Sequence, residues 1–125
     1  MTAPESTAPV RYRDGTAVVD LPAQIDRTAE RALNDAYVAA LEHGSKTVLL
    51  NFAGVEFLSS TGIALIVGIL ARARKDGRAI TAAALSDHYR EIFEITRLAD
   101  FMTIFPNESA AISGTSGEKK GGGET

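Results

Sequence analysis

Three consecutive hydroxyl side chains, Ser59, Ser60 and Thr61, precede Gly62 and are the strongest candidates for chemistry in this sequence. They lie between two apolar runs, so they occupy a turn from a strand into a helix. The first amides of a helix lack internal partners and carry partial positive charge. A hydroxyl oxygen there can cap the helix, and an added phosphate is electrostatically favoured. The stretch is therefore either a phosphorylation site or a plain helix cap.

Strand and helix signals alternate around this stretch. Asp14-Gly15 is a hairpin signal between two β-prone segments, so the chain is expected to open with an antiparallel pair. The pattern as a whole predicts strands at residues 10–13, 16–21, 46–52, 79–84 and 102–105, and helices at residues 27–43, 61–76, 87–96 and 107–112. Because helices must cross over between neighbouring strands, we expect an α/β fold. It has a single mixed sheet of about five strands, with about four helices packed mainly on one face.

The chain has the length of one domain, which we expect to cover residues 9–112. Residues 1–8 are rich in Pro, Thr, Ser and Ala and are expected to be a flexible N-terminus. Residues 113–125 are rich in Gly and Ser and are expected to be a disordered tail, either native or an added linker.

Composition argues against several classes of function. The formal net charge is −3 and the arginines are scattered, so no basic footprint for nucleic acid is present. The longest apolar run, at residues 63–71, is far shorter than the roughly 20 residues that span a bilayer. The N-terminus has no secretory leader pattern. We therefore expect a cytoplasmic protein with no nucleic-acid partner and no membrane insertion.

Signatures of catalysis and metal binding are also missing. The sequence contains no cysteine, no nucleophile elbow, no phosphate-binding loop and no zinc-protease motif. Its two histidines, His43 and His88, have no partner at metal-ligand spacing. We therefore expect no enzyme activity, no catalytic residues, no metal and no cofactor.

The helix that follows Gly62 has apolar residues on two sides. One side is expected to face the sheet and contains Ile63, Ile66, Val67, Leu70 and Arg74. The nearly opposite side contains Leu65, Ile69 and Arg72. Apolar residues on an outer side indicate a surface that binds a partner, unless a neighbouring helix covers them.

About three quarters of the chain, from Thr16 to Ile112, resembles the STAS domain, and especially the anti-sigma factor antagonists of bacterial partner-switching systems. The resemblance rests on residues 48–58 leading into Ser59-Ser60-Thr61-Gly62-Ile63, on the strand from Gly77 to Leu85, and on residues 86–98 followed by Phe105-Pro106-Asn107-Glu108.

The resemblance implies a four-helix, mixed-sheet domain with its phospho-acceptor just before the motif glycine. That residue is Thr61 here, with Ser60 as the alternative, in a phospho-loop that also includes Ser59 and Gly62. The family commonly has Asp where this chain has Ser59. The implied partners are an anti-sigma factor serine/threonine kinase, which the unphosphorylated domain binds to free a sigma factor, and a PP2C-type phosphatase.

Two other functions fit the same residues. The domain is alternatively a structural STAS subunit of a stressosome-like or transporter-associated complex. As a third possibility, Ser59, Ser60 and the amides after Gly62 hold the phosphate of a nucleotide or another anion.

Overall fold

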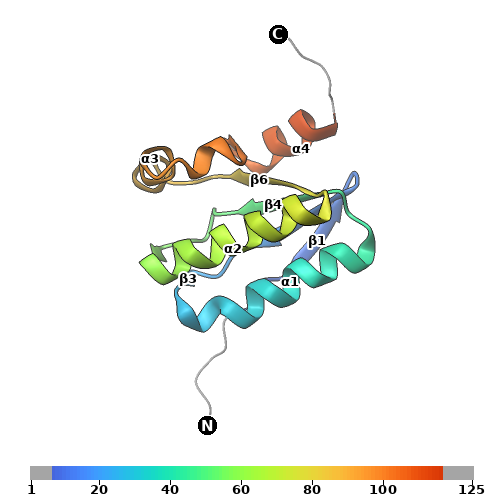
Figure 1. Ribbon diagram of the computed structural model, residues 1–125. Coiled ribbons are helices and arrows are strands. Elements are labelled where there is room, and N and C mark those ends of the chain that lie inside the picture. Colours follow the sequence, from blue (N-terminus) through green and yellow to red (C-terminus); the bar gives the residue numbers. More distant parts are fainter. Residues whose placement is uncertain (1–6, 117–125) are drawn as a thin grey trace.

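The computed structural model describes residues 7–116 (Figure 1). Residues 1–6 and 117–125, which include most of the expected flexible N-terminus and Gly/Ser-rich tail, lie outside the described residues.

A five-stranded mixed sheet forms the centre of the domain. Its strand order is β1-β2-β4-β6-β7. β1 (Val10–Arg13) is antiparallel to β2 (Thr16–Asp20), and the other neighbouring pairs, which add β4 (Thr47–Asn51), β6 (Ala79–Ala83) and β7 (Thr103–Phe105), are parallel. The expected mixed sheet of about five strands is confirmed.

The hairpin between β1 and β2 turns at Asp14 and Gly15. Their φ angles are +50° and +82°. Positive φ at both central residues is typical of a type I′ turn, whose twist matches that of the two strands it joins. The hairpin that Asp14-Gly15 predicted is therefore present.

The described chain contains four α-helices, α1 (Glu30–His43), α2 (Ser60–Asp76), α3 (Asp87–Ile95) and α4 (Glu108–Ser116), and two short 3₁₀ helices, η1 (Arg27–Ala29) and η2 (Leu98–Asp100). α1 and α2 each end at a glycine in the left-handed conformation, Gly44 and Gly77. α4 reaches Ser116, four residues beyond the expected end of the last helix at residue 112.

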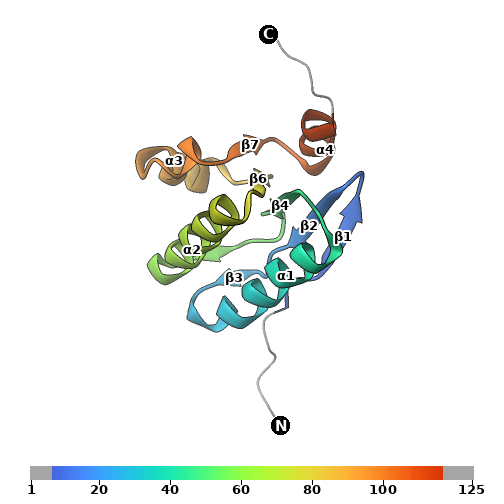
Figure 2. The same ribbon diagram turned by 45° about the vertical axis from the view of Figure 1, so that its right-hand side comes forward.

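Side chains alternate between two faces of the sheet. On one face, Val19, Val48 and Leu50 belong to the main core, together with buried residues of α1, α2 and α3. On the other face, Val18, Leu49 and Ala83 pack against Ala111 and Ile112 of α4. Figures 1 and 2 show α1 and α2 on one side of the sheet and α4 on the other. The helices thus cover mainly one face, as expected, and among the described helices α4 covers the second.

A second, two-stranded sheet was not predicted. β3 (Gln24–Ile25) pairs in parallel with β5 (Phe57–Leu58), with Gln24 opposite Phe57 and Ile25 opposite Leu58. Two residues are too few to show the alternation by which a strand is recognised in a sequence. Its second strand, β5, ends two residues before α2 begins, so the pairing with β3 fixes the chain just ahead of that helix.

Candidate functional site

Ser59 caps α2 and is held in place by β3. Its backbone is extended, and its Oγ accepts a hydrogen bond of 3.0 Å from the Gly62 amide. The Ser59 amide donates to the carbonyl oxygen of Ile25 at 3.0 Å. Ser59 thus satisfies one of the free amides of the first helical turn, which is the role that a capping Asp would also perform.

Gly62 lies where α2 approaches β3 most closely. A Cβ atom at this position would lie 1.9 Å from the Ile25 carbonyl oxygen and 3.0 Å from Cδ1 of Leu58. Because the first of these atoms belongs to the backbone, a rotamer change cannot remove the overlap. The motif glycine is therefore required by the packing of the loop itself.

Ser60 and Thr61 differ from the residues on either side of them. Both are exposed on the first turn of α2, whereas Ser59 is half-buried and Gly62 is buried. The Ser59 hydroxyl is already engaged by the Gly62 amide. The two exposed hydroxyls of the motif are therefore those of Ser60 and Thr61, beside helix amides that favour negative charge.

Residues that are distant in the sequence position the segment before α2. The amides of Glu56 and Phe57 donate to the carbonyl oxygen of Ala23 at 2.7 and 3.0 Å. The amide of Leu58 donates to the hydroxyl of Tyr89, on α3, at 3.0 Å. Ala23, Ile25 and Tyr89 were not predicted to support the site, since these contacts join segments that are distant in the sequence and leave no local pattern.

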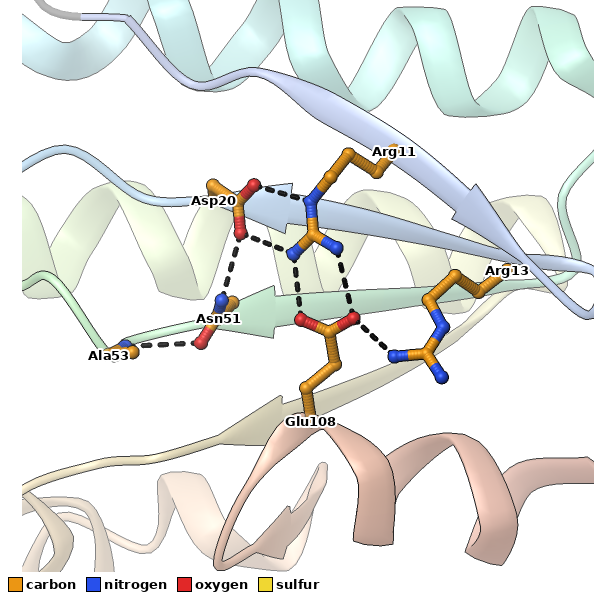
Figure 3. A network of polar contacts seen from close by, with 6 residues as sticks. All are labelled: Arg11, Arg13, Asp20, Asn51, Ala53 and Glu108. Atoms are coloured by element: carbon orange, nitrogen blue, oxygen red, sulfur yellow. Dashed lines mark hydrogen bonds and ion pairs between the residues drawn. The ribbon is translucent and has the colours of Figure 1, made fainter.

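A network of charged side chains lies on the α4 face of the sheet (Figure 3). Arg11 of β1 donates two hydrogen bonds of 2.7 Å to Asp20 and two, of 2.7 and 3.0 Å, to Glu108 at the start of α4. Arg13 donates to the same Glu108 carboxylate at 2.7 Å. The network ties the hairpin to α4, because both arginines of β1 share one carboxylate of that helix.

The same network reaches the segment that leads to the hydroxyl motif. Asn51, the last residue of β4, donates from Nδ2 to Asp20 at 2.8 Å, and its Oδ1 accepts from the amide of Ala53 at 3.1 Å (Figure 3). Asn51 therefore fixes the turn by which the chain leaves β4.

Arg11 lowers the pKa values of two carboxyl groups. Its hydrogen bonds are the main reason that the pKa values of Asp20 and Glu108 lie below their ordinary values. A depressed pKa in the folded state stabilises the fold above the unfolded pKa, which is about 3.9 for Asp and about 4.3 for Glu. That stabilisation is lost as the pH falls through these values towards the folded pKa values.

We expect Arg11→Met to lower the free energy of unfolding at pH 7 by about 1 kcal/mol, a small value because the pairs are partly exposed and screened. Urea unfolding of wild type and variant at pH 7 and pH 3 measures the difference. It should shrink at pH 3, because that pH lies below the unfolded pKa values of both carboxyl groups, where the stabilisation from their depressed pKa values is being lost. An equal difference at both pH values would contradict the assignment of the stabilisation to these ion pairs.

The expectation that Leu65 and Ile69 lie on an outer side of α2 together with Arg72 is wrong for Leu65 and Ile69, because α1 packs beside α2. Ile69 is only 5% exposed and belongs to the main core, and Leu65 is partly buried against that core. Arg72 is exposed, but it donates to Asn34 of α1 at 3.2 Å and lies over the ring of Tyr37. The structure agrees with the alternative stated above, in which a neighbouring helix covers this side of α2.

The exposed side of α2 lies elsewhere on the helix. Val67, expected to face the sheet, is 42% exposed, and Arg74, expected on the same side, is also exposed. We call the exposed residues that follow the hydroxyl motif along this side the outer face of α2: Thr61, Ala64, Val67, Gly68, Ala71 and Lys75. The buried arc is displaced from the expected one because α2 packs against both the sheet and α1.

Gly68 has no internal reason to be glycine. A Cβ atom there would meet no atom within 4 Å. Glycine inside a helix costs about 1 kcal/mol relative to alanine. The outer face of α2 therefore exposes bare backbone at its centre, where another molecule can approach closely.

Neither a metal site nor a membrane span is found in the part of the chain that the structure describes. No group of three His, Cys, Asp or Glu side chains within residues 7–116 is arranged to hold a metal ion. No helix in that range is both long enough and apolar enough to cross a bilayer. Of the two histidines, His43 stacks on Tyr12 and His88 lies beside Tyr89.

Comparison with known proteins agrees with this fold. An anti-sigma-B factor antagonist of Staphylococcus aureus strain NCTC 8325 is 26% identical over 86 residues, which cover 69% of this chain and 80% of that protein. The crystal structure of an anti-sigma factor antagonist from Mycobacterium paratuberculosis superposes with a TM-score of 0.74 at 24% identity, covering 90% of this chain and 97% of that one.

The Bacillus cell fate determinant SpoIIAA, solved in its phosphorylated form, superposes with a TM-score of 0.67 at 21% identity and covers 86% of this chain and 97% of its own. At these identities the structural likenesses establish the fold. The sequence profile of the family described as Mlab, STAS domain matches residues 9–105, which include every strand of the sheet and the whole hydroxyl motif. The resemblance drawn from the sequence is thereby confirmed, and the chain belongs to the STAS domain family.

Proposed function

We propose that this domain is a non-enzymatic anti-sigma factor antagonist that acts in the bacterial cytoplasm. In its unphosphorylated form it binds an anti-sigma factor of the serine/threonine-kinase type and so releases a sigma factor. The proposal is supported by membership of the STAS family and by the S. aureus relative, which is named as an antagonist of this kind.

The observation that carries the proposal is the presentation of Ser60 and Thr61. Both hydroxyls are exposed on the first turn of α2, next to a cap and a glycine that fix the loop. A rigid, exposed hydroxyl at a helix N-terminus is accessible to a kinase, and the free domain tolerates the charge that phosphorylation adds. We propose Thr61 as the phospho-acceptor, with Ser60 as the alternative.

Phosphorylation would act through the interface and not through the fold. A phosphate adds a charge of about −1.5 to −2. In the free domain this charge stays solvated beside the amides of α2, but a closely packed partner would have to desolvate it. A penalty of about 2.7 kcal/mol is enough to weaken binding a hundredfold. A PP2C-type phosphatase would then restore binding by removing the phosphate.

We propose the outer face of α2 as the surface that the anti-sigma factor contacts. This face begins at Thr61 and continues through small or apolar side chains to Ala71. Gly68, at its centre, allows the backbone of α2 to lie close to the partner. The surface replaces the one first expected from Leu65 and Ile69.

Enlarging Gly68 should separate binding from stability. We expect Gly68→Gln to raise the free energy of unfolding by up to about 1 kcal/mol, since glutamine is the better helix former and meets open space. We also expect it to weaken binding to the anti-sigma factor at least about tenfold, because the longer side chain prevents close approach.

Gly68→Ala is the matched control, with the same helix benefit and little added bulk. Isothermal titration calorimetry and urea unfolding of the three proteins give both quantities. If Gly68→Gln binds as tightly as wild type, the outer face of α2 is not the contact surface.

The proposed function is tested by incubating the protein with ATP and each serine/threonine-kinase anti-sigma factor of the same genome, followed by mass-spectrometric mapping of the phosphosite. We expect one phosphate, on Thr61, and none in the Thr61→Ala variant. Modification of Ser60 alone would assign the phospho-acceptor to Ser60 and would leave the proposed control by phosphorylation unchanged. No complex and no phosphorylation with any of these kinases would contradict the proposal and favour a structural STAS subunit.

A further inference from the structure

A groove of about 730 Å³ lies beside the C-terminal half of α2, away from the hydroxyl motif. β6 and the segment from η2 to the start of β7 form its other walls. Its large apolar lining residues are Val67, Leu70, Ile80, Leu98, Phe101 and Met102. Phe101 and Val67 are 58% and 42% exposed, so the groove presents apolar surface to solvent. Its volume lies in the range of sites that hold small molecules.

The charge in the groove is positive. Arg74 and Arg78 both line it, and the guanidinium carbon of Arg74 lies 6.0 Å from the ring centroid of Phe101. Asp100 is the acidic residue among the lining side chains, and its carboxylate is paired with Arg97 at 2.7 Å. An acidic group that enters the groove would therefore meet two guanidinium groups and a carboxylate that is already neutralised.

One of the two groove arginines has a buried nitrogen without a partner. Within the described residues, three buried side-chain polar atoms have no hydrogen-bond partner: Ser45 Oγ, Arg78 Nε and Thr81 Oγ1. Arg78 and Thr81 both line the groove, but the Thr81 side chain alternates with Ile80 and Ala82 and points to the α4 face of the sheet. The Arg78 guanidinium group is thus satisfied only in part by the protein, since its Nη1 donates to the Ser45 carbonyl at 3.0 Å while its Nε has no partner.

We propose that this groove binds a small amphiphilic acid. The apolar chain of the ligand lies against Leu70, Ile80 and Met102, and its acidic head group lies at Arg74 and Arg78. The inference is independent of the proposed partner switch, since it rests on groove residues and not on Thr61. The groove shares Val67 and Ala71 with the outer face of α2, so a bound ligand would lie next to the proposed partner surface.

The probe is decanoate, kept below its micellar concentration. Decanol, which lacks the acidic head group, and acetate, which lacks the long apolar chain, are the control ligands. Binding is followed by amide chemical shifts in ¹⁵N–¹H NMR spectra of the whole protein. We expect decanoate to bind at least about tenfold more tightly than decanol, because charge-assisted hydrogen bonds are the stronger ones, and acetate not to bind measurably. The shifted amides should lie in β6, in the second half of α2 and in residues 98–103.

Four variants locate the site. Arg74→Met should weaken decanoate binding about tenfold or more, and Ala71→Trp should abolish it by filling the groove. Lys75→Met is the matched control, since Lys75 is the next cation on α2 but does not line the groove, and it should bind like wild type. Arg78→Met should also weaken binding. Because Arg78 donates a hydrogen bond to the carbonyl oxygen of Ser45, the fold of this variant must be checked by its amide spectrum.

The proposal is overturned if decanoate does not bind below millimolar concentration, or if decanol binds as tightly. It is also overturned if Lys75→Met weakens binding as much as Arg74→Met, because binding would then depend on general surface charge. None of these results bears on the phosphorylation of Thr61.

Discussion

Replacing Gly62 by alanine is expected to lower the free energy of unfolding by at least about 3 kcal/mol. The new methyl group would lie 1.9 Å from the carbonyl oxygen of Ile25, so either α2 or β3 must move. Movement of either element breaks the hydrogen bond between the Ser59 amide and that carbonyl. So large a decrease in the free energy of unfolding is unusual for the addition of one methyl group. It would show that the backbones of α2 and β3 cannot move apart without cost.

Gly68→Ala is the control for Gly62→Ala, because it makes the same change six residues along the same helix. A methyl group at residue 68 meets no atom within 4 Å, so this variant should be as stable as wild type or up to about 1 kcal/mol more stable. Urea unfolding at pH 7 measures both variants. If the two substitutions have equal effects, the contact between α2 and β3 does not explain the motif glycine.

A negative charge at Thr61 is expected to weaken binding to the anti-sigma factor about a hundredfold, which corresponds to about 2.7 kcal/mol. Thr61→Glu places the charge on the exposed first turn of α2, where the helix amides stabilise it in the free domain. The stability of the free domain should therefore stay the same or rise slightly. Binding should fall, because the interface would have to desolvate the carboxylate.

Thr61→Gln has nearly the size of the glutamate variant without its charge and is the control for bulk. We expect it to bind far more tightly than Thr61→Glu, within about tenfold of wild type. Calorimetric titration and thermal melting of all three proteins give the affinities and the stabilities. Equal losses for both variants would mean that size, and not charge, controls binding at Thr61.

Most of the fold could be predicted because its signals are local. Asp14-Gly15 fixes the hairpin through the turn that it forms. Short apolar runs such as residues 46–52 indicate buried strands, and the expected strands and helices lie close to the observed ones. The second sheet of β3 and β5 could not be predicted, since strands of two residues show no periodicity.

The site could be predicted only in part, because its support comes from distant segments. The hydroxyl motif locates the start of α2, but nothing near Gly62 in the sequence indicates the carbonyl of Ile25. The orientation of α2 failed for a related reason. Ile69 and Val67 are equally apolar in the sequence. They differ in burial because α2 packs against both the sheet and another helix, and their positions determine which side chain lies in the buried arc.

The central claim is that one phosphate on Thr61 switches the partner off while the fold stays intact. The most direct measurement is the affinity of the anti-sigma factor kinase for wild-type protein, first unphosphorylated and then stoichiometrically phosphorylated, with unchanged amide spectra away from α2 as the check on the fold. We predict at least a hundredfold weaker binding of the phosphorylated protein, reversed by phosphatase treatment. Equal affinity of the two forms would contradict the claim.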